Sequence, residues 1–148
     1  MCMTYYIATK TEMPIIPYDE KNRSFNTDKI TDEENSLHTV FSLPYIKMFG
    51  SDQGCGCGFR HAIIDENKKW FDVIDPPNEF DNSNHINLVD FISKNNMKEN
   101  KVEILSCWNG DFNEPIEHRQ TIKLSDILQL DFHFKERGLY TVDLKNYR

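Results

Sequence analysis

The sequence has no long apolar run and comparatively little positive charge. No stretch approaches the ~20 apolar residues of a membrane-spanning helix, and the first residues lack the basic head and apolar core of a secretory signal. Seventeen Lys and Arg residues stand against 24 Asp and Glu residues, which gives a net charge of −7. Because binding to duplex DNA and to anionic membranes depends on basic side chains, the sequence predicts a protein that binds neither nucleic acid nor membranes. The missing secretory signal and membrane helix predict a cytoplasmic location.

The common catalytic and nucleotide-binding motifs are absent as well. The sequence contains no nucleophile elbow of the serine hydrolases, no paired-histidine zinc helix and no P-loop, and its five histidines are scattered. We therefore expect a protein that is not an enzyme and has no resident cofactor. One catalytic alternative stays open, a cysteine nucleophile at Cys57 or Cys107 with His61 or His118 as its base.

The sequence does contain enough apolar material for a hydrophobic core. Of its 148 residues, 39% are hydrophobic and 12% are aromatic, which is more than disordered chains carry. A chain of this length is typical of one folded domain and buries a core without disulfides. We expect a single globular domain over residues 1–148.

Hydrophobic periodicity and turn residues predict the secondary structure. The expected strands cover residues 4–9, 45–49, 62–64, 68–74, 101–108, 121–124, 132–134 and 139–144, and the last two are expected to pair as a hairpin. The expected helices cover residues 31–41 and 82–97, with one helical turn at 125–130, and residues 17–28 are expected to form a surface loop. This order predicts an α+β fold, with a mixed or mainly antiparallel sheet and one or two helices packed on one face.

The most unusual segment is Gly-Cys-Gly-Cys-Gly at residues 54–58, which holds three of the six glycines and two of the four cysteines. We expect it to be extended and to lead into the strand at 62–64. Cys55, Cys57 and His61 would then share one face of that strand. The glycines would leave room for a backbone, an aromatic ring or a ligand to approach closely. These close-approach glycines are Gly54, Gly56 and Gly58.

Two functional interpretations of this segment stand beside a structural one. Two thiolates on one face can converge on a zinc ion, and because a structural zinc site takes four ligands, we expect Cys107 and His61 to complete it. A redox role requires a lowered thiol pKa, for which His61 is the best-placed source of positive charge. The structural alternative is that the thiols are small apolar core residues, since free cysteine is among the most buried residue types.

Acidic residues provide the other functional hypothesis. If the fold gathers them on one side, their field would favour a basic protein partner. Trp108 could add an aromatic anchor to such an interface. We therefore expect a small non-enzymatic binding protein, analogous in charge alone to adaptor proteins or to immunity proteins that neutralise basic toxins, and a thiol-dependent metal-binding or redox protein is the alternative. The acidic residues form two groups, Asp28, Asp32, Glu33 and Glu34, and Asp65, Glu66, Asp72, Asp75, Glu79 and Asp81.

Overall fold

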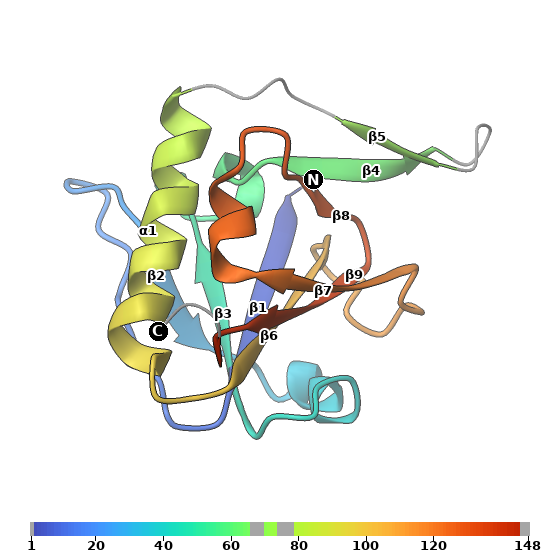
Figure 1. Cartoon of the computed structure of the whole chain (residues 1–148), viewed down its shortest axis with the longest axis horizontal. Helices are drawn as coiled ribbons and strands as arrows, with labels where there is room; N and C mark the ends of the chain where they lie inside the picture. Colours follow the sequence, from blue (N-terminus) through green and yellow to red (C-terminus); the bar gives the residue numbers. More distant parts are fainter. Residues whose placement is uncertain (1, 66–69, 74–78, 146–148) are drawn as a thin grey trace.

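The computed structural model describes residues 2–65, 70–73 and 79–145, and a six-stranded sheet forms its centre (Figure 1). The strand order is β2-β3-β1-β6-β9-β7. All neighbouring pairs are antiparallel except β7 and β9, which are parallel. The mixed, mainly antiparallel sheet predicted from the sequence is therefore confirmed. Its strands are β1 (Met3–Thr9), β2 (Asn26–Lys29), β3 (Tyr45–Gly50), β6 (Lys101–Trp108), β7 (His118–Lys123) and β9 (Gly138–Asp143).

A smaller sheet and four helical segments complete the described part of the chain. The smaller sheet has the order β5-β4-β8, with β4 antiparallel to β5 and parallel to β8. None of the helices among the described residues has the length and apolar character that a bilayer span requires. These elements are β4 (His61–Asp65), β5 (Trp70–Val73), β8 (Phe134–Lys135), the α-helix α1 (Glu79–Asn96) and the 3₁₀ helices η1 (Glu33–Thr39), η2 (Gly56–Gly58) and η3 (Leu124–Leu128).

The main sheet has an apolar core on each face, because alternate residues of a strand point in opposite directions. On β1, Tyr5 and Ile7 contact the core that includes Leu88 and Ile92 of α1. Tyr6 of the same strand points to the second core, which includes Leu37 of η1. Full burial of each aliphatic side chain contributes about 1.5–3 kcal/mol, so packing against the sheet is what stabilises α1.

The helix expected at residues 31–41 is present as η1, and it covers the face of the sheet opposite to α1. The spacing of Thr31 and Glu34 predicts a capping box, and the Glu34 carboxylate accepts the Thr31 backbone N–H at 2.8 Å. Strand β2 occupies part of the stretch expected to be a loop. It pairs with β3 along the sheet edge, and the polar residues of this short edge strand gave no alternating pattern in the sequence.

The predicted hairpin between residues 132–134 and 139–144 is wrong. Strand β8 pairs with β4 in the small sheet, whereas β9 lies between β6 and β7 in the large one. The Phe134 ring is fully buried, with its centroid 5.1 Å from that of Tyr5 in β1, and the Phe134 backbone N–H donates to the Arg60 carbonyl at 3.0 Å, next to the start of β4. The turn between the two strands contains Arg137 at φ 51°, so the chain turns sharply and changes sheets there.

Candidate metal centre

The glycine-cysteine segment is not a strand, which corrects the expectation for residues 55–60. Residues Gly56–Gly58 form η2, a single 3₁₀ turn in which the Phe59 N–H donates to the Gly56 carbonyl at 3.1 Å. Strand β4 begins only at His61. The segment folds in this way because it lies directly against the start of β1 and against α1.

The glycines allow this close packing. A Cβ atom at Gly56 would lie 2.4 Å from Cδ2 of Tyr5 and 2.5 Å from the carbonyl oxygen of Met3. A Cβ atom at Gly58 would lie 2.5 Å from the Ser51 hydroxyl and 2.6 Å from the Asn84 amide nitrogen. Any other residue would push η2 away from these neighbours, so the repeated glycines are explained by protein packing.

Ser51 holds the loop that precedes η2. Its hydroxyl donates to the Cys55 carbonyl at 2.7 Å and accepts the backbone N–H groups of Gly58 at 3.1 Å and Gln53 at 3.2 Å. Its own backbone N–H also donates to the Cys55 carbonyl, at 2.8 Å. One donor and two acceptors are all that a hydroxyl offers, so Ser51 uses its full capacity to shape the backbone around Cys55.

Asn84 of α1 joins the same loop to the helix. Its side-chain amide donates to the Gly58 carbonyl at 3.1 Å and to the Asp52 carboxylate at 2.9 Å. Its carbonyl oxygen accepts the Asp52 backbone N–H at 3.0 Å. Asn84 is 1% exposed, and buried hydrogen bonds of this kind fix the position of a segment strongly.

Arg60 and His85 fix the chain on the other side of η2. The Arg60 backbone N–H donates to Nε2 of His85 at 2.9 Å, and Nδ1 of His85 donates to the Ile127 carbonyl at 2.8 Å. Nε2 must therefore be unprotonated, which makes His85 neutral. Burial, together with the nearby Arg60 charge, lowers the pKa of His85 to about 3. The Arg60 guanidinium, 1% exposed, donates to the carbonyls of Gln129 at 2.7 Å and Phe132 at 3.0 Å.

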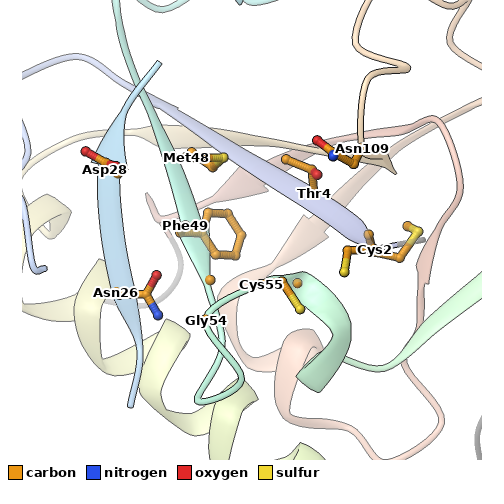
Figure 2. Close-up of a pocket in the computed structure, with 12 residues that line it drawn as sticks. Cys2, Thr4, Asn26, Asp28, Met48, Phe49, Gly54, Cys55 and Asn109 are labelled. Carbon is orange, nitrogen blue, oxygen red and sulfur yellow. The ribbon is translucent and has the colours of Figure 1, made fainter. Parts of the chain in front are cut away.

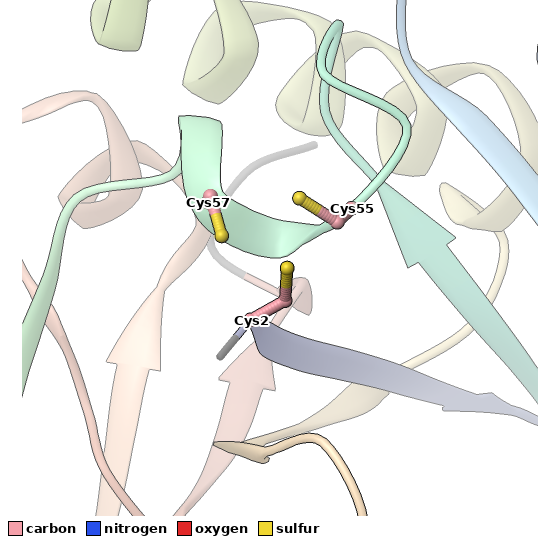
Figure 3. Close-up of side chains that lie close together, drawn as sticks. All are labelled: Cys2, Cys55 and Cys57. Atoms are coloured by element: carbon pink, nitrogen blue, oxygen red, sulfur yellow. The ribbon is translucent and has the colours of Figure 1, made fainter.

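Three cysteine sulfurs lie close together beside η2, which these hydrogen bonds hold in place. Figure 3 shows Cys55 and Cys57 of the η2 segment pointing toward Cys2, which directly precedes β1. The three Sγ atoms all lie within 4.8 Å of one another, and all three residues are half-buried. The Cys2 carbonyl accepts the Asn109 N–H at 2.8 Å, which anchors the start of the chain to the end of β6.

These separations are close to those of a metal site. Zinc binds thiolate sulfur at about 2.3 Å, so sulfurs in a tetrahedral zinc site lie about 3.8 Å apart. A contraction of at most about 1 Å, within the reach of side-chain rotation, therefore brings the three sulfurs to coordination distance. No disulfide joins them, and all four cysteines are free thiols.

Without a metal ion, the Cys57 thiol of this cluster keeps its proton at neutral pH. Burial, together with the hydrogen bond to Cys55, raises the pKa of the Cys57 thiol to about 12, although a hydrogen bond from the Met3 backbone acts in the opposite direction. A thiol with such a raised pKa is a poor nucleophile and a poor redox centre at neutral pH. A bound cation reverses the effect, because a coordinating thiol loses its proton outright.

The third sulfur beside Cys55 and Cys57 belongs to Cys2, whereas the structure places the expected ligands Cys107 and His61 elsewhere. Cys107 is 1% exposed in the core beneath η1, and burial raises the pKa of its thiol to about 12. His61 directs Nδ1 at the Phe59 carbonyl, 3.0 Å away, and its ring centroid lies 6.3 Å from that of Trp108. Among the described residues, neither Cys107 nor His61 contributes a metal-ligating atom to the group formed by Cys2, Cys55 and Cys57.

The candidate interface residues differ in how far they are exposed to solvent. Asp32 and Glu33 are exposed, but Glu34 is only 7% exposed and accepts a hydrogen bond from the Tyr6 hydroxyl. Its burial removes Glu34 from any surface patch. Trp108 is partly buried, and its indole N–H donates to Glu136 at 2.8 Å. The side chains of the second acidic group, residues 65, 66, 72, 75, 79 and 81, lie outside the described residues, so protein binding through an acidic surface stays a prediction.

A cavity of about 250 Å³ lies beside the sulfur cluster (Figure 2). Cys2 and Cys55 both line it, and Figure 2 shows Asp28 of β2 on the opposite side. The remaining lining residues are Met3, Thr4, Asn26, Met48, Phe49, Gly50, Gly54, Gly56 and Asn109.

Comparisons of the chain with protein-family models, with curated proteins and with solved structures give no match. The function must therefore be argued from the site itself.

Sequence reasoning missed the residues that complete and support this centre. Cys2 stands far from Cys55 in the sequence, and no spacing motif connects the two. Ser51 and Asn84 are ordinary polar residues whose roles appear only when the loop and α1 come together. Arg60 offered one signal, because an arginine beside an apolar strand needs acceptors for its guanidinium. The sequence does not identify the carbonyls of Gln129 and Phe132 as those acceptors.

Proposed function

We propose that this protein binds a thiophilic metal ion through Cys2, Cys55 and Cys57. The observation that carries the proposal is the convergence within 4.8 Å of the Cys2 sulfur and the two sulfurs of a loop that is fixed from both sides. Thiolates select soft and borderline ions, of which zinc and copper(I) are the common cellular examples. The reducing cytoplasm expected from the sequence keeps such thiols available for coordination.

Hydrogen bonds to the backbone around Cys55 and Cys57 give the support that a metal site requires. Ser51 and Asn84 hold the backbone on either side of Cys55 and Cys57 before any ion arrives, so little ordering is needed on binding. The Cys2 carbonyl is held by the Asn109 N–H at 2.8 Å. Binding would therefore join the start of β1 to η2 without rearranging the fold, which is the behaviour of a resident structural or regulatory ion.

The proposal is tested by titrating the reduced, chelator-treated protein with Co²⁺ and following thiolate-to-cobalt absorption. We expect one ion per chain, displaced by zinc. Substitution of Cys2, Cys55 or Cys57 by Ser should weaken binding by at least about tenfold, because each removes one of three ligands. Cys107→Ala is the matched control, since this buried thiol lies outside the cluster, and it should bind the ion normally. Absence of stoichiometric binding, or loss of binding in Cys107→Ala alone, would overturn the proposal.

A further inference from the structure

The sulfur cluster offers three donors, and a zinc-type ion takes four. Among the described residues, no fourth Cys, His, Asp or Glu atom joins the group. His61, the closest imidazole in the sequence, is turned toward the Phe59 carbonyl. Sites with three protein ligands are typical of ions whose fourth position exchanges with water or an external ligand.

The cavity borders two of the three cysteines of the cluster. Cys2 and Cys55 form part of the cavity wall, whereas Cys57 is not among the described lining residues. An ion held by the three sulfurs would therefore have Cys57 on one side and the cavity on the side of Cys2 and Cys55. The cavity holds about 250 Å³, which is below the ~300–1,000 Å³ of sites for drug-sized ligands. A cavity of this size suits only a small molecule.

The charge of the site restricts the chemistry of that molecule. Three thiolates and a divalent ion leave one net negative charge, and the exposed carboxylate of Asp28 lies on the far side of the cavity. None of the described residues that line the cavity is Lys, Arg or His. The whole chain also has a net charge of −7. An anionic donor would enter against all of these charges, whereas a neutral donor on a cationic molecule would not.

We propose that the ion held by Cys2, Cys55 and Cys57 keeps a fourth position open to this cavity and binds there a small molecule with a neutral nitrogen donor, preferably one that carries a positive charge. This inference rests on the proposed metal-binding function. In the exchange, the nitrogen lone pair replaces a water molecule on the ion, and no proton or electron is transferred. Three sulfurs and one imidazole nitrogen make a donor set that zinc adopts widely in proteins.

Three compounds with the same donor ring test the inference in the Co²⁺-loaded protein. Histamine carries a positive charge, imidazole is neutral, and imidazole-4-acetate carries a negative charge, while all three rings are mainly neutral at pH 8. We expect each compound to shift the cobalt absorption bands, with affinity falling in the order histamine, imidazole, imidazole-4-acetate. The metal content after desalting must stay at one ion per chain, which shows that the compound joins the site and does not remove the ion.

Two substitutions of exposed aspartates separate the cavity from general surface charge. Asp28→Asn should lower the ratio of histamine affinity to imidazole-4-acetate affinity by about two- to fivefold, the size expected for a partly solvated charge interaction. Asp32→Asn is the matched control, because Asp32 is an exposed aspartate that does not line the cavity, and the ratio should stay unchanged.

The results distinguish this inference from the proposed function. If Co²⁺ does not bind, both are wrong. If Co²⁺ binds but none of the three compounds alters its spectrum, only the open position is wrong. If the bound cobalt already shows a nitrogen ligand that disappears in His61→Ala, the chain fills the fourth position itself and this inference fails. An affinity ratio that responds equally to Asp28→Asn and Asp32→Asn would overturn the role assigned to the cavity.

Discussion

Lowering the pH from 7 to 5 should destabilise this protein through His85. The side chain belongs to α1 and is fully buried against the segment that follows η2, and it is neutral because Nε2 accepts the Arg60 N–H. Burial, reinforced by the Arg60 charge, lowers its pKa in the folded protein to about 3. The unfolded chain binds a proton at an ordinary pKa of about 6.5. Between these values the unfolded state holds more protons than the folded state, so stability falls as the pH falls.

The size of the effect follows from the distance below the unfolded pKa. Each pH unit below about 6.5 costs about 1.36 kcal/mol until the folded pKa is approached, so 1.5 units to pH 5 cost about 2 kcal/mol. Because pH 5 lies well above the folded value of about 3, the loss is almost complete for that interval. Other groups titrate in the same range, and the contribution of His85 must therefore be isolated by substitution.

His85→Gln provides that isolation. A glutamine amide can accept the Arg60 N–H and donate to the Ile127 carbonyl, as the imidazole does, but it does not titrate. We expect this variant to be less stable at pH 7, because it loses the ring contacts with Phe59 and Phe134, and to lose about 2 kcal/mol less than the natural chain between pH 7 and pH 5. Urea unfolding at both pH values measures the difference. Equal pH dependence in the two proteins would refute the reasoning.

Two further predictions concern η2 and the thiols. Gly56→Ala should lower the free energy of unfolding in urea by about 1–3 kcal/mol and weaken Co²⁺ binding, because its Cβ would lie 2.5 Å from the Met3 carbonyl oxygen. The control Gly110→Ala is strained at φ 92° but has no neighbour within 4 Å, so it should lower stability without changing metal affinity. Equal metal affinities in both variants would contradict this account. In the metal-free folded protein, Cys57 and Cys107 should react with iodoacetamide at pH 7.5 at least about tenfold more slowly than after unfolding, because burial raises both thiol pKa values to about 12. Mass spectrometry of the modified peptides measures the two rates, and a fast-reacting Cys57 in the folded protein would contradict the prediction.

Much of the fold could be predicted because its strongest signals are local. Strands β1, β3, β6 and β9 and helix α1 all lie within a few residues of their predicted positions. Each has an apolar pattern that its own burial explains, as in β1, where all seven residues are buried on one face or the other. Pairing is not local, which is why the partners of β8 and β9 were predicted wrongly.

The glycine-cysteine segment shows where local reasoning stops. Its alternating residues have the period of a strand, but neither Gly nor Cys fixes the backbone strongly. The 3₁₀ turn forms because the Ser51 hydroxyl and the Asn84 amide bond to the backbone of the segment, and because Gly56 fits under the Tyr5 ring. The convergence of Cys55 and Cys57 was expected for the wrong geometric reason, and the third sulfur, Cys2, could not be predicted at all.

Cys2 reaches the cluster only because β1 is a central strand in a fixed register. Met3 lies opposite Trp108, and the next position brings the Cys2 carbonyl to the Asn109 N–H. A slip of one residue would exchange the two faces of β1, moving Tyr5 and Ile7 out of the α1 core. The packing that fixes this register therefore also places the Cys2 sulfur. Because Cys2 and Cys55 are far apart in the unfolded chain, an ion bound by all three sulfurs binds the native state preferentially, and at a concentration 100-fold above its dissociation constant it would stabilise that state by about 2.7 kcal/mol. Metal binding at the proposed site would thus be coupled to the pairing of the central strand.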